Sequence, residues 1–222
     1  AGHFPEGQLI DDENRLCERF NVSKSVVREA VKILVDKGLL EVRRGNGTRV
    51  RTRASWKLLD DDVLAWHLGT EPKPNFLRQL IDVRLMVEPN AAYWAASMSS
   101  RDQVDEIHKA HSDMERAGTI QEFVVADAKF HRAVLRAANN ELLTSMEGVI
   151  FSALLTSIKI TNNDPIDNRT RSLPLHFEIL NAIEMRDRER AETAMRDHMA
   201  DTYDRLSALL PELNLETKIY DT

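Results

Sequence analysis

The stretch from residue 11 to residue 51, DDENRLCERFNVSKSVVREAVKILVDKGLLEVRRGNGTRVR, decides the fold of the first part of this chain. Apolar residues recur at helical spacing in two segments, which predicts one helix over Asp11–Phe20 and a second over Lys24–Lys37. Ser23 is a suitable N-cap for the second helix, and Gly38 is a suitable C-cap. Two helices joined by a short turn form a helix-turn-helix pattern.

Two short strands are expected directly after these helices, at Leu40–Arg43 and Thr48–Arg51. Gly45-Asn46-Gly47 lies between them, and Asn-Gly is a strong signal for a β-hairpin. A hairpin that follows a helix-turn-helix is the wing of a winged helix. Residues 1–54 are therefore predicted to form an α+β winged helix-turn-helix domain.

From Leu58 onward the sequence shows helical periodicity and no strand-like alternation. The pattern predicts helices at about residues 60–68, 73–98, 101–117, 119–138, 140–160, 168–186 and 188–210. Helices joined by short connections predict an antiparallel bundle. The expected fold class is mainly α: the winged domain at 1–54, a linker at 55–59, and an all-α antiparallel helical bundle at 60–222.

Charge is distributed unevenly along the 222 residues, whose net charge is -6. Residues 1–54 hold 11 Lys and Arg against 8 Asp and Glu, a net charge of +3, so the remainder carries -9. Only the first segment has a balance suited to phosphate contact. The single cysteine, Cys17, excludes an internal disulfide framework, and no apolar run approaches the roughly 20 residues that span a bilayer. We expect a cytoplasmic protein without a membrane partner.

One carboxylate and three imidazoles have the spacing of a metal site. Asp127 and His131 are four residues apart, so on a helix they project from one face, about 40° apart. His176 and His198 lie in two further amphipathic segments, so three helices can direct all four side chains at one point. This donor set suits a borderline divalent metal, zinc first, with nickel or manganese as alternatives. The other closely spaced pair, His108 and His111, is interpreted as lying on the surface.

The run from Ser23 to Ala30, SKSVVREA, and the run from Gly38 to Thr48, GLLEVRRGNGT, closely resemble the GntR family of bacterial regulators. The family pattern is roughly V-S-R-x-x-V-R-E-A, then G-L and a basic wing that contains glycine. The resemblance implies that operator DNA is bound by Asn14, Arg15, Ser23, Lys24, Ser25, Arg28, Lys32, Arg44, Asn46 and Gly47.

The chain departs from this family pattern at two positions and at its start. Asn14 and Lys24 stand where the family usually has arginine, which predicts a shifted operator preference. The helix that normally precedes Phe4-Pro5 in the family is expected to be missing from this chain.

Three later stretches resemble the FCD effector domain, the helical C-terminal domain of the FadR branch of this family. They are Leu77–Glu88, Asp127–Asn140 and His176–His198, and the family pattern is R-x-x-x-E, D-x-x-F-H, H-x-x-I/L and a final H. The resemblance implies that Asp127, His131, His176 and His198 are the metal ligands. The helix expected at 58–68 resembles the sugar-acid regulators of this branch.

The chemistry of this donor set agrees with a carboxylic acid effector. Three neutral imidazoles and one carboxylate leave part of the charge of a divalent cation uncompensated, and an octahedral ion keeps open positions. A 2-hydroxy or 2-keto acid can fill them through its carboxylate and the adjacent oxygen. Arg84 is expected to pair with the effector carboxylate through its planar fork. Glu88, one turn later, is expected either to orient Arg84 or to cap a neighbouring helix end.

Together these patterns predict a metal-dependent, ligand-responsive bacterial transcriptional regulator. We expect a homodimeric repressor whose affinity for operator DNA is controlled by a small carboxylic acid, with sugar acids ahead of dicarboxylates or fatty acids. In the alternative, the helical domain only dimerises around a structural metal, and a closed tetrahedral site would favour it. An enzyme such as a zinc hydrolase is not expected, because the sequence has no H-E-x-x-H and no convincing general base.

Overall fold

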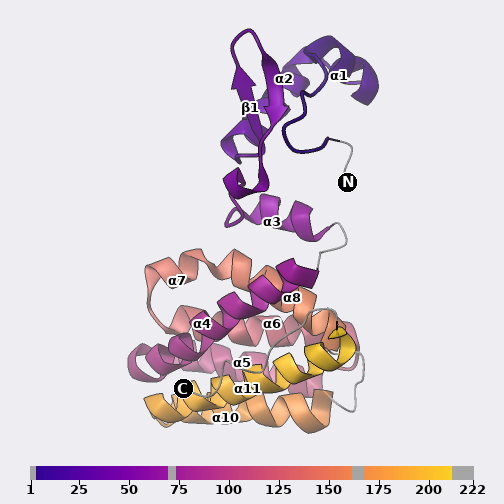
Figure 1. Ribbon diagram of the computed structural model, residues 1–222. Helices are drawn as coiled ribbons and strands as arrows, with labels where there is room; N and C mark the ends of the chain where they lie inside the picture. Colours follow the sequence, from indigo (N-terminus) through magenta and orange to yellow (C-terminus); the bar gives the residue numbers. More distant parts are fainter. Residues whose placement is uncertain (1–3, 70–73, 162–167, 212–222) are drawn as a thin grey trace. The chain divides into compact units, whose positions relative to one another are not determined.

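The computed structural model of the chain describes residues 4–69, 74–161 and 168–211 (Figure 1). The chain divides into two compact units, with the boundary between Thr70 and Glu71. Helices dominate both units, and the sheet found among the described residues has two strands. The predicted fold class, a winged helix-turn-helix followed by an all-helical domain, is confirmed.

The first unit contains the predicted succession of a helix, a second helix and a hairpin. Its elements are α1 (Glu13–Phe20), α2 (Lys24–Asp36), β1 (Leu40–Arg43), β2 (Gly47–Val50), the 3-10 turn η1 (Arg53–Ser55) and α3 (Asp61–Leu68). The strands are antiparallel, with Leu40 opposite Val50 and Arg43 opposite Gly47. Between α1 and α2, Asn21 takes a left-handed conformation, which turns the chain from one helix to the next.

The end of α2 depends on a glycine. Gly38 has a φ of +78°, its N–H donates to the Val35 carbonyl at 3.0 Å, and the N–H of Leu39 donates to the Leu34 carbonyl at 2.9 Å. These two bonds form a Schellman cap. A Cβ at Gly38 would lie 2.2 Å from the Ser55 carbonyl oxygen, because the chain returns after the wing and passes against this turn. The position therefore needs glycine for its conformation and for its space.

Helix α3 is held to the rest of the first unit by charged and aromatic contacts. Lys37 Nζ lies 2.7 Å from Asp60 Oδ1 and 2.9 Å from Asp62 Oδ2, and these hydrogen bonds raise the pKa of Lys37. The Trp56 ring meets the His67 ring edge-on at 6.3 Å between centroids. The sequence assigned α3 to the helical domain, whereas these contacts attach it to the winged unit.

The second unit is entirely helical where the structure describes it. Its elements are α4 (Pro74–Met98), α5 (Arg101–Arg116), α6 (Ile120–Ala137), α7 (Glu141–Ser145), α8 (Glu147–Thr161), the π-helical turn η2 (Asn168–Ser172), α10 (Leu173–Glu184) and α11 (Arg188–Leu209). Helix α4 packs against α6, α8, α10 and α11, and α5 packs against α6 and α10 (Figure 1). The helices α4, α6, α10 and α11 therefore meet around one core, from which the candidate site is built.

Two central helices begin with reciprocal side-chain caps. The Ser100 hydroxyl accepts from the N–H of Gln103 at the start of α5, and the Gln103 side chain accepts from the N–H of Ser100. Thr119 and Glu122 form the same arrangement at the start of α6. Such capping boxes satisfy amides that have no partner within the helix. They define where α6, which carries two residues of the site, begins.

Two predicted helices differ from those observed. The helix expected at 140–160 is interrupted at Met146, which separates α7 from α8. The Ser145 hydroxyl there donates to the Leu142 carbonyl at 2.6 Å, a local bond that competes with the backbone ladder. The helix expected at 168–186 begins with the η2 turn and ends at Glu184.

Small and aliphatic side chains fill the core of the second unit. Buried residues from α4, α5, α6, α10 and α11 form one cluster, which includes Phe130 and Ile179. A second cluster joins α6 to α8 through Leu135 and Leu154. Within the described ranges no helix has both the length and the apolar character to cross a membrane.

Candidate metal and effector site

Six ionisable side chains lie buried together in the second unit. Each of them is at most 5% exposed: Arg84 and Glu88 on α4, Asp127 and His131 on α6, His176 on α10, and His198 on α11. Burying a charged or polar group is costly unless it is paired or coordinates a metal. Their contacts with one another therefore define what this cluster can bind.

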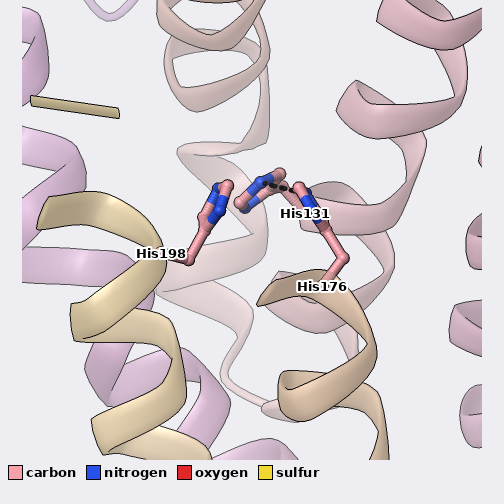
Figure 2. Close-up of side chains that lie close together, drawn as sticks. All are labelled: His131, His176 and His198. Atoms are coloured by element: carbon pink, nitrogen blue, oxygen red, sulfur yellow. Dashed lines mark hydrogen bonds between the residues drawn. The ribbon is translucent and has the colours of Figure 1, made fainter. Parts of the chain in front are cut away.

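The three imidazoles converge on a common point (Figure 2). One ring nitrogen from each of His131, His176 and His198 lies within 4.8 Å of the others. The Nε2 atoms of His131 and His176 are 3.2 Å apart, and Asp127 Oδ1 lies 3.4 Å from each of them. The structure thus brings together all four residues that were predicted as metal ligands.

Hydrogen-bond acceptors lie beside the outer nitrogens of two of these rings. His176 Nδ1 lies 2.8 Å from the Ser172 carbonyl oxygen, to which it can only donate. His131 Nδ1 lies 2.6 Å from Glu88 Oε2. In the form that binds a metal, each ring carries its single proton on Nδ1 and a lone pair on Nε2, and the two Nε2 atoms face each other. Outer partners of this kind fix the tautomer and orientation of metal-binding histidines.

His198 completes the fit to a cation. Its Nδ1 is buried and has no hydrogen-bond partner among the residues that the structure describes. Burial, together with the neighbouring His176 and His131, holds the pKa of His198 well below its usual value. The ring is therefore neutral, which is the form in which an imidazole binds a metal. An unsatisfied imidazole nitrogen next to two convergent Nε2 atoms fits a divalent metal ion.

Both carboxylates in the cluster are ionised. Burial acts to raise the pKa of Asp127, but His176 and His131 outweigh it and hold the pKa well below the usual value. For Glu88, burial is likewise outweighed by Arg84 and His131, and the pKa falls to about 2. The site therefore offers a charged oxygen donor from Asp127 beside the nitrogen donors.

Arg84 is directed at Glu88. Its Nε lies 2.5 Å from Glu88 Oε1 and its Nη2 lies 3.4 Å from Glu88 Oε2, and Arg84 is 1% exposed. Sequence reasoning expected Glu88 either to orient Arg84 or to cap a helix. It did not anticipate that Glu88 also contacts His131, which lies 43 positions later on another helix.

The interpretation of His111 as a surface residue is wrong, whereas His108 is exposed as predicted. His111 is 4% exposed, and its ring lies 6.4 Å from the Phe130 ring and 5.9 Å from the Phe177 ring, centroid to centroid. The sequence did contain a signal for this, because His111 continues a buried helical stripe made of Ile107, Ala110 and Met114.

The residues predicted to bind DNA lie on the surface of the first unit. All ten are exposed: Asn14, Arg15, Ser23, Lys24, Ser25, Arg28, Lys32, Arg44, Asn46 and Gly47. Ser23 occupies the N-cap position of α2 as predicted, but its hydroxyl lies 2.8 Å from the Ser25 hydroxyl and caps no backbone amide. The N-terminus of α2 is therefore not covered by its own cap, and such a terminus suits phosphate.

Comparisons with known proteins agree with this division of the chain. Residues 1–50 match the model for bacterial regulatory proteins of the gntR family, and residues 79–201 match the FCD domain. The galactonate operon transcriptional repressor of Escherichia coli K12 is 31% identical over 94% of this chain and 91% of its own length. The Glc operon transcriptional activator of the same strain is 28% identical over 89% and 80%. A solved structure described as Streptococcus agalactiae GntR has a TM-score of 0.55 and 28% identity, covering 92% of this chain and 91% of its own.

Proposed function

Because this chain belongs to the GntR family of bacterial regulatory proteins and carries an FCD domain, we propose that it is a metal-dependent repressor controlled by a sugar acid. The family assignment makes it a ligand-responsive transcriptional regulator and not an enzyme. The metal, the homodimer, the repressor sense and the effector class go beyond that assignment and belong to the proposal. The observation that carries it is the convergence of three buried imidazoles and Asp127, with Arg84 linked to His131 through Glu88.

The first unit is proposed to bind operator DNA. The exposed start of α2, with Lys24 and Arg28, suits insertion into the major groove, where an arginine can read guanine through two hydrogen bonds. Arg28 Nε lies 2.9 Å from Glu13 Oε1, an exposed ion pair that the guanidinium can leave at little cost. Arg44 and Asn46 lie in the wing turn, where backbone contacts with DNA would hold the orientation of the domain.

The second unit is proposed to hold the metal and the effector. Asp127, His131, His176 and His198 would ligate a divalent cation, for which zinc is the first choice and nickel or manganese are alternatives. When bound, the metal supplies a Lewis-acidic anchor for a carboxylate and an adjacent hydroxyl. Arg84 is the residue proposed to meet the effector carboxylate, since a planar guanidinium can bind a second anion beside Glu88.

The effector class is inferred from the donor set and from the relatives. One relative is named for galactonate, a 2-hydroxy acid whose carboxylate and neighbouring hydroxyl suit two positions of an octahedral cation. We therefore propose a sugar acid of this chemical type for the present chain. The competing proposal is a purely structural metal within a dimerisation domain, in which the buried Arg84 would serve only to pair with Glu88.

The test combines metal analysis with operator binding. The metal-loaded chain should bind operator DNA tightly, and saturating galactonate should weaken that binding, whereas protein stripped with a chelator should lose the response to galactonate. Metal at less than one tenth of an equivalent per chain would refute the metal proposal. A bound metal with no response to a panel of sugar acids would favour the structural alternative, and tighter operator binding in the presence of acid would refute release of the repressor by the acid.

A further inference from the structure

A buried chain of charged contacts runs from Arg84 on α4 through Glu88 to His131 on α6. Glu88 Oε1 lies 2.5 Å from Arg84 Nε, and Glu88 Oε2 lies 2.6 Å from His131 Nδ1 and 3.4 Å from Arg84 Nη2, so the carboxylate contacts both side chains. The side chains of Arg84, Glu88 and His131 are 1%, 3% and 0% exposed. Solvent therefore does not screen these contacts.

We propose that Glu88 is a positioning residue that sets the metal affinity of His131 and makes this affinity depend on Arg84. The inference rests on the proposed metal site and deepens it. Glu88 does not belong to the predicted ligand set, and its effect would pass entirely through the imidazole that it contacts.

The contact with Glu88 acts directly on His131. When Nδ1–H donates to a carboxylate, the ring is fixed in the tautomer whose Nε2 lone pair points away from Glu88, toward His176 Nε2 at 3.2 Å. The negative charge of the carboxylate also makes that lone pair more basic. Partners of this kind change metal affinity by roughly 10–100-fold when they are removed.

Arg84 acts on the other side of the same carboxylate. An isolated carboxylate is strongly destabilised in a buried, apolar environment, and the adjacent guanidinium offsets that cost. Arg84 also withdraws negative charge from the carboxylate that His131 uses as its acceptor. An anion that binds Arg84 would compete for the guanidinium and leave more of the Glu88 charge to His131, which would tighten metal binding. By linkage, the metal would tighten anion binding by the same factor.

The experiment uses the full chain and zinc as the probe. Zinc affinity is measured by competition with a chelating dye for the wild type, Glu88→Gln, and the control Glu178→Gln, whose carboxylate pairs with Arg190 at 2.6 Å on an exposed face of α10. Glu88→Gln should weaken zinc binding roughly 10–100-fold, and Glu178→Gln should leave it within twofold. Wild-type affinity in Glu88→Gln would overturn the inference while leaving the proposed metal site in place. Failure of the wild type to bind zinc would instead overturn the proposed function.

A double-mutant cycle tests whether Arg84 acts through Glu88. Arg84→Met should change zinc affinity in the wild-type background and leave it within twofold in the Glu88→Gln background. An equal effect in both backgrounds would overturn the relay. If Arg84→Met alone does not fold, the comparison of Glu88→Gln with the double variant still decides, because a difference of more than twofold in zinc affinity between them would show an effect of Arg84 that does not pass through Glu88.

Proton NMR of the zinc-loaded protein measures the chemical shift of the His131 Nδ1 proton, which would not change if Glu88 had only a structural role. The Nδ1 proton of His131 should resonate far downfield in the wild type and in Glu178→Gln, and it should shift upfield in Glu88→Gln. An unchanged resonance in Glu88→Gln would contradict the contact on which the inference depends.

Discussion

At the scale of single residues, the site depends on buried ionisable groups that contact one another. Asp127 and His131 share a helix face, and Glu88 and the Ser172 carbonyl occupy the outer nitrogens of His131 and His176. Among the described residues, neither His198 Nδ1 nor His131 Nδ1 has a hydrogen bond of good geometry, but His131 Nδ1 lies 2.6 Å from Glu88 Oε2, whereas no carboxylate contacts His198 Nδ1. Removing His198 therefore removes a proposed ligand without breaking a hydrogen bond of its Nδ1.

His198→Ala should lose stoichiometric metal while the metal-free chain keeps its fold. In the wild type, zinc should raise the unfolding temperature, because it binds the folded state and ties α6, α10 and α11 together. His198→Ala should show little such rise, and the exposed His108→Ala should behave as the wild type. The measurements are elemental analysis after dialysis and thermal unfolding with and without zinc. Full metal occupancy in His198→Ala would place the site elsewhere.

Two basic residues of α2 should differ in their effects on DNA binding. Arg28→Ala should cost about 1–3 kcal/mol on the operator and less on scrambled DNA, if Arg28 reads a base. Lys32→Ala should weaken both duplexes about equally, because a phosphate contact carries no sequence information. Titration of both variants on both duplexes separates these roles. Wild-type affinity in both variants would remove the recognition role assigned to α2.

At the scale of secondary-structure elements, the end of α2 determines how the segment after the wing is placed. Gly38 allows the Ser55 backbone to pass close by, and Lys37 next to it binds Asp60 and Asp62 of the following segment. Two adjacent residues therefore do both tasks: Gly38 ends α2, and Lys37 attaches α3.

Gly38→Ala should destabilise the first unit more than Gly45→Ala. Both glycines have positive φ, +78° and +80°, so either substitution should cost about 1–2 kcal/mol of backbone strain. Nothing lies within 4 Å of a Cβ at Gly45, whereas at Gly38 the Ser55 carbonyl must move, which adds about 1–3 kcal/mol for overpacking. Hydrogen exchange of α2 and α3 amides in the full chain measures the difference. Equal protection in the two variants would refute the steric argument.

At the scale of the whole molecule, DNA binding and effector binding belong to separate compact units that differ in charge. The first unit, residues 1–70, carries a net charge of +1, with +3 on residues 1–54, and the second unit carries -7, so attraction to phosphate belongs to the winged unit. One winged helix reads only a few base pairs, and a two-fold symmetric pair doubles both the contacts and the specificity.

The chain should therefore be a homodimer on a pseudo-palindromic operator. Light scattering after gel filtration should give twice the 25.3 kDa mass of one chain at micromolar concentration. Footprinting should protect two half-sites whose centres lie about one helical turn of DNA apart, or a multiple of it. A monomer that protects a single half-site would contradict this.

Most of the fold followed from local patterns in the sequence. The helix-turn-helix, the hairpin at Asn46-Gly47 and the Gly38 cap each depend on residues a few positions apart, and their physical causes act over the same distance. The i,i+4 spacing likewise placed Asp127 and His131 on one face of α6. The convergence of His176 and His198 was expected from amphipathic spacing and family resemblance.

The remaining features were decided by tertiary packing. The contact of Glu88 with His131, the attachment of α3 to the winged unit and the burial of His111 between aromatic rings all join residues on different elements. Periodicity shows which face of a helix is buried, but not which neighbour that face meets or which polar group its side chain reaches. The i,i+4 spacing of Arg84 and Glu88 was visible in the sequence. The contact of Glu88 with the His131 imidazole was not, because a hydrogen bond requires atoms within about 3 Å, and this distance depends on how α4 packs against α6.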